Sequence, residues 1–397
     1  MMLSQRAGRI RPFYVMEMAK AAAEIGRAAQ HSERPMIYLN IGEPDFTAPE
    51  LVREAAQRAI QDGKTQYTQA TGLGPLRERI AAWYGTRLGV QIDAGRIVVT
   101  AGASAALQLA CLALIDPGDH ILMPDPSYPC NQQFVHAADG AAVLLPTSAA
   151  QRFQLDAAMV EQAWPRSTGR TRGVMLASPS NPTGTSIDPA ELRRIHQVVS
   201  AHGGITLVDE IYLGLSFEEA FGHSALALDE QIVSINSFSK YFSMTGWRLG
   251  WMVVPRELVG AIEKLAQHLF ICPSTIAQHA AMACFEPSSL AEYERRRAEF
   301  KLRRDYLVPA LRALGLEVPV PPDGAFYVWA DCSQVCQRLG IKDSWDFAFA
   351  LMRQAHVAVT PGRDFGNAQT ARFIRLSSAS SMQQLTAAVQ RMRAMLA

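Results

Sequence analysis

The chain has 397 residues, of which 49% are hydrophobic and 19% are charged. This composition excludes a largely disordered chain and is sufficient for a large core, in one extended α/β fold or in two or three domains. The 38 lysines and arginines nearly balance the 37 acidic residues, and a net charge of +1 argues against a nucleic-acid-binding surface or a polybasic membrane surface.

The cysteines have neither the spacing of a metal site nor that of a redox motif, so we expect reduced thiols, no disulfide framework and no bound metal. They are Cys111, Cys130, Cys272, Cys284, Cys332 and Cys336. No apolar run is long enough for a membrane-spanning helix. The arginines near the N-terminus precede no continuous apolar stretch, which favours a cytoplasmic protein over a secreted one. An organellar transit segment is the alternative, because Glu17 is the first acid.

The first part of the chain predicts three helices and one short strand. Residues 13–30 are rich in alanine with an apolar stripe, and residues 49–62 and 74–88 have helical patterns. Between the first two helices, the apolar segment from Met36 predicts a strand that ends at Gly42.

Seven short apolar runs then alternate mostly with helices. They cover residues 96–100, 120–125, 141–146, 173–178, 205–210, 231–237 and 249–255. Unbroken apolar strands that alternate with helices indicate a mostly parallel sheet covered on both faces. The predicted fold class is therefore α/β.

After about residue 287 the pattern changes. A long charged helix is predicted at 289–315, followed by strands at 325–331, 356–362 and 371–377 and by a closing helix at 381–396. We predict a large domain at 45–287 that contains the mostly parallel sheet. A smaller α+β domain would combine residues 1–44 with residues 288–397, because the N-terminal strand lies outside the alternating region.

Polar groups follow the ends of five predicted strands, which is where ligands bind in parallel sheets. In chain order they are a turn suited to an anion, an aromatic plate, an amide, a carboxylate, a phenol and an amine: residues 101–104, Tyr128, Asn181, Asp209, Tyr212 and Lys240. This set suits a flat, phosphorylated aromatic aldehyde with a ring nitrogen, which is pyridoxal phosphate.

The segment SFSKYFSMTGWRLG (237–250) resembles the pyridoxal-phosphate attachment site of the class I/II aminotransferases. Further segments match this family in the same order along nearly the whole chain. They are IGEPDF (41–46), YTQATGLGPLR (67–77), TAGASAALQLA (100–110), DPSY (125–128), NPTG (181–184), VDEIY (208–212), PGRDFG (361–366) and RFIRLS (372–377). The resemblance implies fold type I, amino acid and 2-oxo acid substrates, and a homodimer with shared active sites.

The resemblance also implies three catalytic residues. Lys240 forms the Schiff base with the cofactor aldehyde, and once displaced by the substrate amine it moves the Cα proton. Asp209 pairs with the pyridine nitrogen and keeps it protonated, so that the ring accepts carbanion charge. Tyr212 bonds the ring oxygen with Asn181 as its amide partner. From the residues alone, an ordinary turn is the better interpretation of Asn181.

Further contacts to the cofactor follow from the same resemblance. The phosphate is held by backbone N–H groups at a helix start, a hydroxyl and a guanidinium: Ala103, Ser104, Ser237 and Arg248. Tyr67 reaches the phosphate from the neighbouring subunit. Tyr128 stacks on the ring, unless it serves only core packing.

The substrate contacts come from both ends of the chain. Arg375, an arginine within an apolar strand, binds the α-carboxylate bidentately, and Gly42 and Asn181 contact the substrate as well. The segment Cys272–Thr275 is expected to cross the subunit interface.

Two positions depart from the family pattern. Ala103 replaces a common glycine, and Arg363 replaces a small residue, which would change the charge near the entrance.

The implied activity is that of an aminotransferase with ping-pong kinetics. A pyridoxal-phosphate-dependent C–S β-lyase is the alternative, because it would use the same carbanion and the same residues. A non-catalytic regulator that binds pyridoxal phosphate is disfavoured, since Gly42 comes too early for a preceding DNA-binding domain. No motif predicts which amino acid is the donor.

Overall fold

The computed structural model describes residues 3–10, 14–28, 34–166 and 169–397. The ends of the helix predicted at 13–30 therefore lie outside the described residues, and its middle forms α2 (Tyr14–Ala28). A short helix, α1 (Gln5–Arg9), precedes it and has no counterpart among the predicted elements.

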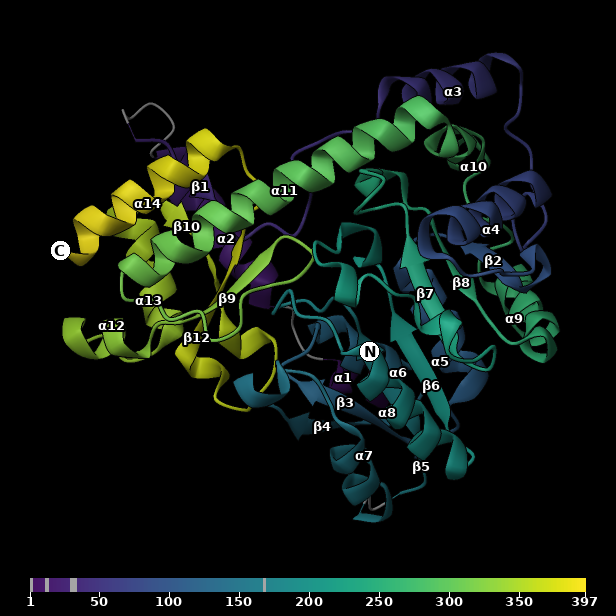
Figure 1. The fold of residues 1–397 in the computed structure, drawn as a ribbon, viewed down its shortest axis with the longest axis horizontal. Coiled ribbons are helices and arrows are strands. Elements are labelled where there is room, and N and C mark those ends of the chain that lie inside the picture. Colours follow the sequence, from purple (N-terminus) through teal and green to yellow (C-terminus); the bar gives the residue numbers. More distant parts are fainter. Residues whose placement is uncertain (1–2, 11–13, 29–33, 167–168) are drawn as a thin grey trace.

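A seven-stranded sheet forms the centre of the larger part of the molecule (Figure 1), with the order β2-β8-β7-β6-β5-β3-β4. The strands are β2 (Ile97–Thr100), β3 (His120–Asp125), β4 (Ala141–Pro146), β5 (Thr171–Ala177), β6 (Ile205–Asp209), β7 (Val233–Ser237) and β8 (Gly250–Val253). Strands β3 to β7 are mutually parallel, whereas β8 runs antiparallel to β7 and β2. The predicted α/β class with a mostly parallel sheet is confirmed.

The chain reverses its direction between β7 and β8. Residues 238–249 join β7 to β8 and hold a single 3₁₀ turn, Thr245–Trp247, in place of a helix. Parallel neighbours are usually joined through an α-helix, and this connection contains none. The connection carries Lys240 and Arg248, which places both residues near the carboxyl end of β7.

Helices cover both faces of the sheet. Successive side chains of a strand point to opposite faces, so each buried strand has apolar side chains on both faces that need covering. Met175 and Leu207 pack on one face with α5 (Ala103–Leu114), α6 (Pro129–Ala137) and α9 (Arg256–Leu269). Their neighbours Leu176 and Val208 pack on the other face with α7 (Ala157–Ala163) and α8 (Pro189–Ala201).

An aromatic core adjoins the β2–β8 edge of the sheet. Trp251 of β8 packs there against Tyr84 and Phe238. The helices around it are α3 (Glu50–Gln61), α4 (Gly74–Leu88) and α10 (Thr275–Met282).

The C-terminal part of the chain has its own hydrophobic core around two small sheets (Figure 1). One is antiparallel with the order β11-β12-β9, and the other pairs two strands in parallel. The strands are β1 (Ile37–Tyr38), β9 (Tyr327–Asp331), β10 (Val357–Ala358), β11 (Thr360–Pro361) and β12 (Phe373–Ser377). The helices are α12 (Ser333–Leu339), α13 (Ser344–Ala350) and α14 (Met382–Leu396).

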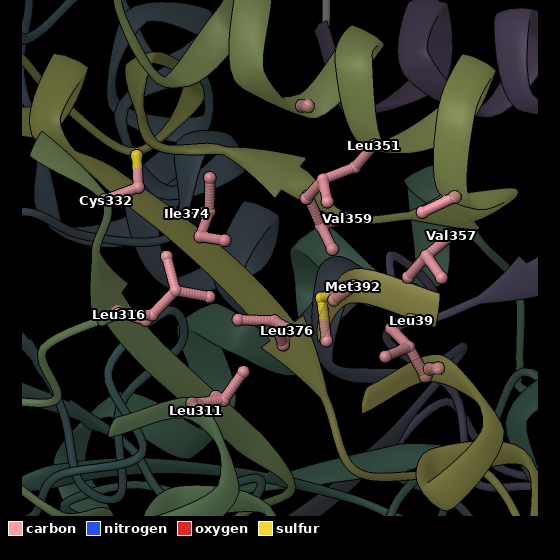
Figure 2. Close-up of a cluster of buried hydrophobic side chains, with 14 of the residues drawn as sticks. Leu39, Leu311, Leu316, Cys332, Leu351, Val357, Val359, Ile374, Leu376 and Met392 are labelled. Atoms are coloured by element: carbon pink, nitrogen blue, oxygen red, sulfur yellow. The ribbon is translucent and has the colours of Figure 1, made fainter. Parts of the chain in front are cut away.

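The N-terminal segment packs with this C-terminal core. Strand β1 pairs with β10, and Figure 2 shows Leu39 in the same cluster as Ile374 of β12 and Met392 of α14. Helix α11 (Pro287–Ala313) connects the two parts (Figure 1), because Phe300 belongs to the aromatic core and Leu311 to the C-terminal core. The boundaries that separate 45–287 from 1–44 and 288–397 stay a prediction.

One predicted strand is divided. The segment 356–362 forms two strands, because β10 pairs with β1 while β11 pairs with β12, and Val359 lies between them. Within the described ranges, no helix is long and apolar enough to cross a membrane. A cytoplasmic location stays a prediction.

Candidate active site

A cavity of about 320 Å³ lies at the carboxyl ends of β5, β6 and β7, next to β9 and β12 of the C-terminal part. Its lining contains every predicted site residue except Tyr67. They are Gly42, Ala103, Ser104, Tyr128, Asn181, Asp209, Tyr212, Ser237, Lys240, Arg248 and Arg375. The short loops after the parallel strands and one strand of the C-terminal part therefore bring together residues far apart in the sequence.

Lys240 is half-buried and lines this cavity. Its Nζ donates a hydrogen bond to the backbone oxygen of Gly42 at 2.5 Å. Burial lowers the pKa of this amine to about 8, and the cations of Arg375 and Arg248 act in the same direction, whereas Glu43 and Asp209 oppose them. A lysine with such a pKa is partly neutral near physiological pH, as a nucleophile or a base requires.

Asp209 ends β6 and is 6% exposed. One of its oxygens accepts a hydrogen bond from the backbone N–H of Ile211 at 3.1 Å. Burial raises the pKa of this carboxyl to about 6, and Lys240 opposes the rise. A buried acid at a cavity wall favours a cationic partner, and a protonated ring nitrogen is such a partner.

An anion cradle forms where α5 begins. Gly102 precedes the helix with a φ of +83°, and a Cβ at this position would lie 2.7 Å from Nη2 of Arg248. A Cβ at Gly250 would likewise lie 2.7 Å from the backbone nitrogen of Ala103. Gly102 thus leaves room for Arg248 at the helix start, and Gly250 lets β8 lie close to it. Free N–H groups and a guanidinium suit a phosphate.

Ser237 belongs to the same cradle. Its Oγ donates to the backbone oxygen of Leu249 at 3.2 Å and accepts from the N–H of Ser239 at 3.0 Å. Ala103 lines the cavity next to Ser104 in the first turn of α5, so the methyl group that replaces a common glycine leaves the backbone donors in place.

Arg375 is 3% exposed and lies on β12. Its acceptors are all neutral: Nη1 donates to Asn181 Oδ1 at 3.0 Å, and Nη2 donates to the oxygen of Asn40 at 2.7 Å and to Thr360 Oγ1 at 3.2 Å. Its Nε has no hydrogen-bond partner. A buried guanidinium with neutral partners retains its full charge for an anionic ligand, and a carboxylate matches its planar fork.

Tyr212 and Tyr128 complete the walls. Tyr212 is 4% exposed, and its Oη lies 2.7 Å from the Oη of Tyr327. Tyr128 is the residue before α6 and lines the cavity with part of its surface exposed. Asn181, which the turn NPTG alone could not assign, is buried at 7% exposure and contacts Arg375.

Tyr67 lies outside the cavity and is 82% exposed. Its neighbours contact the segment expected at the subunit interface, since Thr275 Oγ1 donates to the oxygen of Gln66 at 2.7 Å and the N–H of Thr68 donates to Cys272 Sγ at 3.5 Å. Tyr67 and residues 272–275 thus belong to one region of the surface. The role of Tyr67 in a neighbouring site stays a prediction.

Several cavity residues have no predicted role. Tyr327, Glu43, Thr245 and Ser239 line the cavity too. Arg363, in contrast, does not line it: the guanidinium lies 4.3 Å from the ring centroid of Trp345 and 3.7 Å from Asp343. The expected change of charge near the entrance stays a prediction, and Trp345 and Asp343 are the contacts of this side chain.

The donor set fits pyridoxal phosphate. Separate groups are present for a phosphate, for a ring nitrogen and for an aldehyde, and the glycines at 102 and 250 keep the cradle open for an anion. No group of three or more potential metal ligands gathers anywhere in the described part of the chain. The six cysteines are free thiols.

Comparisons with known proteins agree with this chemistry. Residues 34–392 match the sequence model of the family described as aminotransferase class I and II. The chain is 38% identical to valine–pyruvate aminotransferase of Mycobacterium tuberculosis over 97% of this chain and 96% of that protein. The crystal structure of an aminotransferase from Mycobacterium tuberculosis has a TM-score of 0.93 at 37% identity, over 100% of this chain and 99% of that chain. Aspartate aminotransferase from Thermus thermophilus with maleate has a TM-score of 0.90 at 32% identity, over 100% of both chains.

Proposed function

This chain belongs to the class I and II aminotransferases and uses pyridoxal phosphate, and we propose that the cavity around Lys240 is where it moves an amino group from an L-amino acid to a 2-oxo acid. The observation that carries the proposal is that one cavity is lined by the half-buried amine of Lys240, the buried carboxyl of Asp209 and the buried guanidinium of Arg375. When bound, pyridoxal phosphate supplies an aldehyde that exchanges amines and a ring that takes up the electron pair of the broken Cα–H bond.

The cofactor would be held from three sides. Arg248, Ser237 and the first N–H groups of α5 would hold the phosphate. Asp209 would keep the ring nitrogen protonated, because a buried carboxylate is most stable next to a positive charge. Tyr128 would stack on the ring, and Tyr212 and Asn181 would bond its oxygen.

Lys240 would act at two atoms in turn. Its Nζ would first hold the cofactor and, once released, would remove the proton from the substrate Cα and return it, as general base and general acid. The pKa of about 8, which burial causes, keeps part of the amine neutral for this task. Two successive half-reactions in one site predict ping-pong kinetics.

Arg375 would bind the substrate α-carboxylate with Gly42 and Asn181 close by. Because the fork of Arg375 is already oriented by Asn181, Asn40 and Thr360, it is preorganised for a bidentate contact. This contact would fix the Cα proton relative to Lys240.

The donor is proposed to have an uncharged side chain. The cations that line the cavity are Lys240, Arg248 and Arg375, as far as the described residues show, and each has a role already. Glu43, which also lines the cavity, would repel a second carboxylate. A relative is a valine–pyruvate aminotransferase, and we therefore propose valine-type donors with pyruvate-type acceptors before aspartate.

A homodimer with shared active sites is part of the proposal. Tyr67 is 82% exposed, and the apolar side chains Ile60 and Ile271 are 56% and 53% exposed, so all three side chains are accessible to a second subunit.

The test is a donor screen with the purified enzyme and pyridoxal phosphate. We expect L-valine and pyruvate to give stoichiometric amounts of the oxo acid and alanine, with aspartate reacting more slowly and Lys240→Ala inactive. Release of ammonia and pyruvate from cystathionine, without transfer to an oxo acid, would instead indicate the C–S lyase, which no observation favours. Retained transfer in Lys240→Ala would contradict the assignment of the site.

A further inference from the structure

Tyr327 contacts several of the proposed site residues at once. It lies on β9, is 1% exposed and lines the cavity. Its Oη is 2.7 Å from Tyr212 Oη, and its ring centroid is 4.5 Å from the guanidinium carbon of Arg375. A Cβ at position 42 would lie 2.6 Å from the same Oη, so Gly42 provides the space for this hydroxyl.

We propose that Tyr327 is a positioning residue for amino transfer: its hydroxyl donates to Tyr212 Oη, and its ring supports the guanidinium of Arg375. This inference rests on the proposed function and adds to it a residue that connects the carboxylate site with the cofactor site. The hydroxyl and the ring carry separate effects, so each can be removed on its own.

The charges around the two phenols favour Tyr327 as the donor. Burial raises the pKa of Tyr327, but the Arg375 cation against its ring opposes the rise. Burial and the neighbouring phenol raise the pKa of Tyr212 well above its usual value, although the Arg375 cation opposes this rise too. The Arg375 guanidinium carbon lies 4.5 Å from the Tyr327 ring centroid, and a cation beside a phenol makes its hydroxyl a better donor, so we assign the proton between the oxygens to Tyr327. The O–H of Tyr212 then stays available to the cavity that this residue lines.

The ring of Tyr327 has a second effect. Asn181, Asn40 and Thr360 accept hydrogen bonds from the terminal nitrogens of Arg375. The ring of Tyr327 lies against the guanidinium, and the Phe365 ring centroid is 5.1 Å away. Cation–π contacts of this kind stabilise a buried arginine and fix the plane of its fork.

The hydroxyl is tested by Tyr327→Phe in the holoenzyme. A stronger donor on the ring oxygen lowers the pH at which the nitrogen of Lys240 loses its proton, and the absorbance of bound pyridoxal phosphate reports that midpoint. Removal of the Tyr327 hydroxyl weakens the donation by Tyr212, and the midpoint should rise by about 0.5–1 pH unit, as expected for one buried hydrogen bond.

The double variant decides whether Tyr327 acts through Tyr212. Tyr212→Phe should raise the midpoint further, and Tyr212→Phe/Tyr327→Phe should equal Tyr212→Phe alone, because no donor remains to be oriented. A midpoint that falls in Tyr327→Phe would show that Tyr212 donates in the wild type, and independent effects in the double variant would show a separate role. Either result overturns the inference.

The ring is tested with 3-methylbutanoate, a carboxylate without an amino group, whose dissociation constant follows from the absorbance change. Tyr327→Phe keeps the ring and should bind it within about twofold of the wild type, whereas Tyr327→Leu should bind it about fivefold or more weakly and raise KM more than it lowers kcat. Tyr327→Met serves the same purpose if leucine disturbs the core. Equal affinity in all variants would remove the supporting role.

Tyr84→Phe is the matched control. Tyr84 is buried outside the cavity, and its Oη accepts from Trp251 Nε1 at 3.2 Å. Loss of the Tyr84 hydroxyl should leave the absorbance midpoint and the affinity for 3-methylbutanoate unchanged. If the wild type has no titrating absorbance that depends on Lys240, the proposed function fails. If the wild type titrates and Tyr327→Phe has the same midpoint, only the inference about Tyr327 fails.

Discussion

Two neighbouring acids at the end of β6, Asp209 and Glu210, face different regions of the molecule and have different numbers of hydrogen-bond partners. Glu210 is 1% exposed and accepts from Ser224 Oγ at 2.9 Å, from the N–H of Ala225 at 2.6 Å and from Ser234 Oγ at 2.6 Å. Asp209 is 6% exposed, lines the cavity and accepts from the N–H of Ile211. Both are buried, but Asp209 keeps capacity for a ligand.

Two arginines repeat the contrast. Arg303 is 4% exposed and pairs with Asp45 at 2.8 Å and with Glu299 at 2.9 Å. Arg375 is 3% exposed, but its acceptors are neutral and its Nε has none. The comparison suggests a rule for this chain: buried charges with complete partners hold the fold, and buried charges with incomplete partners serve the ligand.

The largest effect is expected for Asp209→Asn. The amide can no longer keep the ring nitrogen protonated, so kcat should fall by about 100- to 1000-fold while the protein still binds pyridoxal phosphate. Single-turnover absorbance measurements with L-valine give the rate, and the matched variant Glu210→Gln should stay close to the wild type. A normal rate in Asp209→Asn would remove its electronic role.

The next effect is expected for Arg375→Lys. A point charge cannot form the bidentate contact, so KM for amino acids should rise by about 10- to 100-fold with a smaller change in kcat. Arg303→Lys is the control, because its partners Asp45 and Glu299 are structural: we expect a lower melting temperature and an unchanged KM. An unchanged KM in Arg375→Lys together with a raised KM in Arg303→Lys would contradict the comparison between the two arginines.

Glu210→Gln should change stability and its pH dependence in the apoprotein. Burial raises the pKa of Glu210 to about 7, so the folded state holds this proton to higher pH than the unfolded chain does. Between about pH 4 and 7 the folded state therefore binds more protons, and the stability of the wild type falls as the pH rises. The variant loses about 1–2 kcal/mol of hydrogen bonding at low pH but lacks this decline.

Urea unfolding at a series of pH values measures the difference between the two proteins. The deficit of Glu210→Gln relative to the wild type should shrink from pH 5 to pH 8. A deficit that grows with pH would mean that Glu210 is ionised in the folded protein at low pH.

The smallest effect is expected for Arg363→Ala. Its guanidinium stacks on Trp345 outside the cavity, so KM should stay unchanged and stability should change by only about 0.5–1 kcal/mol. Steady-state kinetics at two salt concentrations check this. A salt-sensitive change in KM would support a role at the entrance.

The strands and their loops were accessible from the sequence because apolar runs and turn residues are local signals. The runs at 120–125 and 141–146 match β3 and β4, and the cavity gathers the residues expected after the strand ends. The direction of β8 and the division of 356–362 depend on partners elsewhere in the chain, so no local pattern predicts them.

Within the site, the role of Tyr327 could not be predicted from a local sequence pattern either. Every residue of β9 is buried, so a strand pattern cannot separate a cavity residue from a core residue. Its role depends on contact with Tyr212 and Arg375, which only the fold brings together. The hydrogen bonds of Glu210 could not be predicted from a local pattern, because its serine partners lie 14 and 24 residues away.

The covalent position of the cofactor tests the central claim most directly. The holoenzyme is treated with borohydride, digested and mapped by mass spectrometry, with Lys240→Ala as the control. The account predicts one modified peptide, which carries reduced pyridoxal phosphate on Lys240 and is absent from the variant. A tag on another lysine, or no tag on protein saturated with the cofactor, would contradict it.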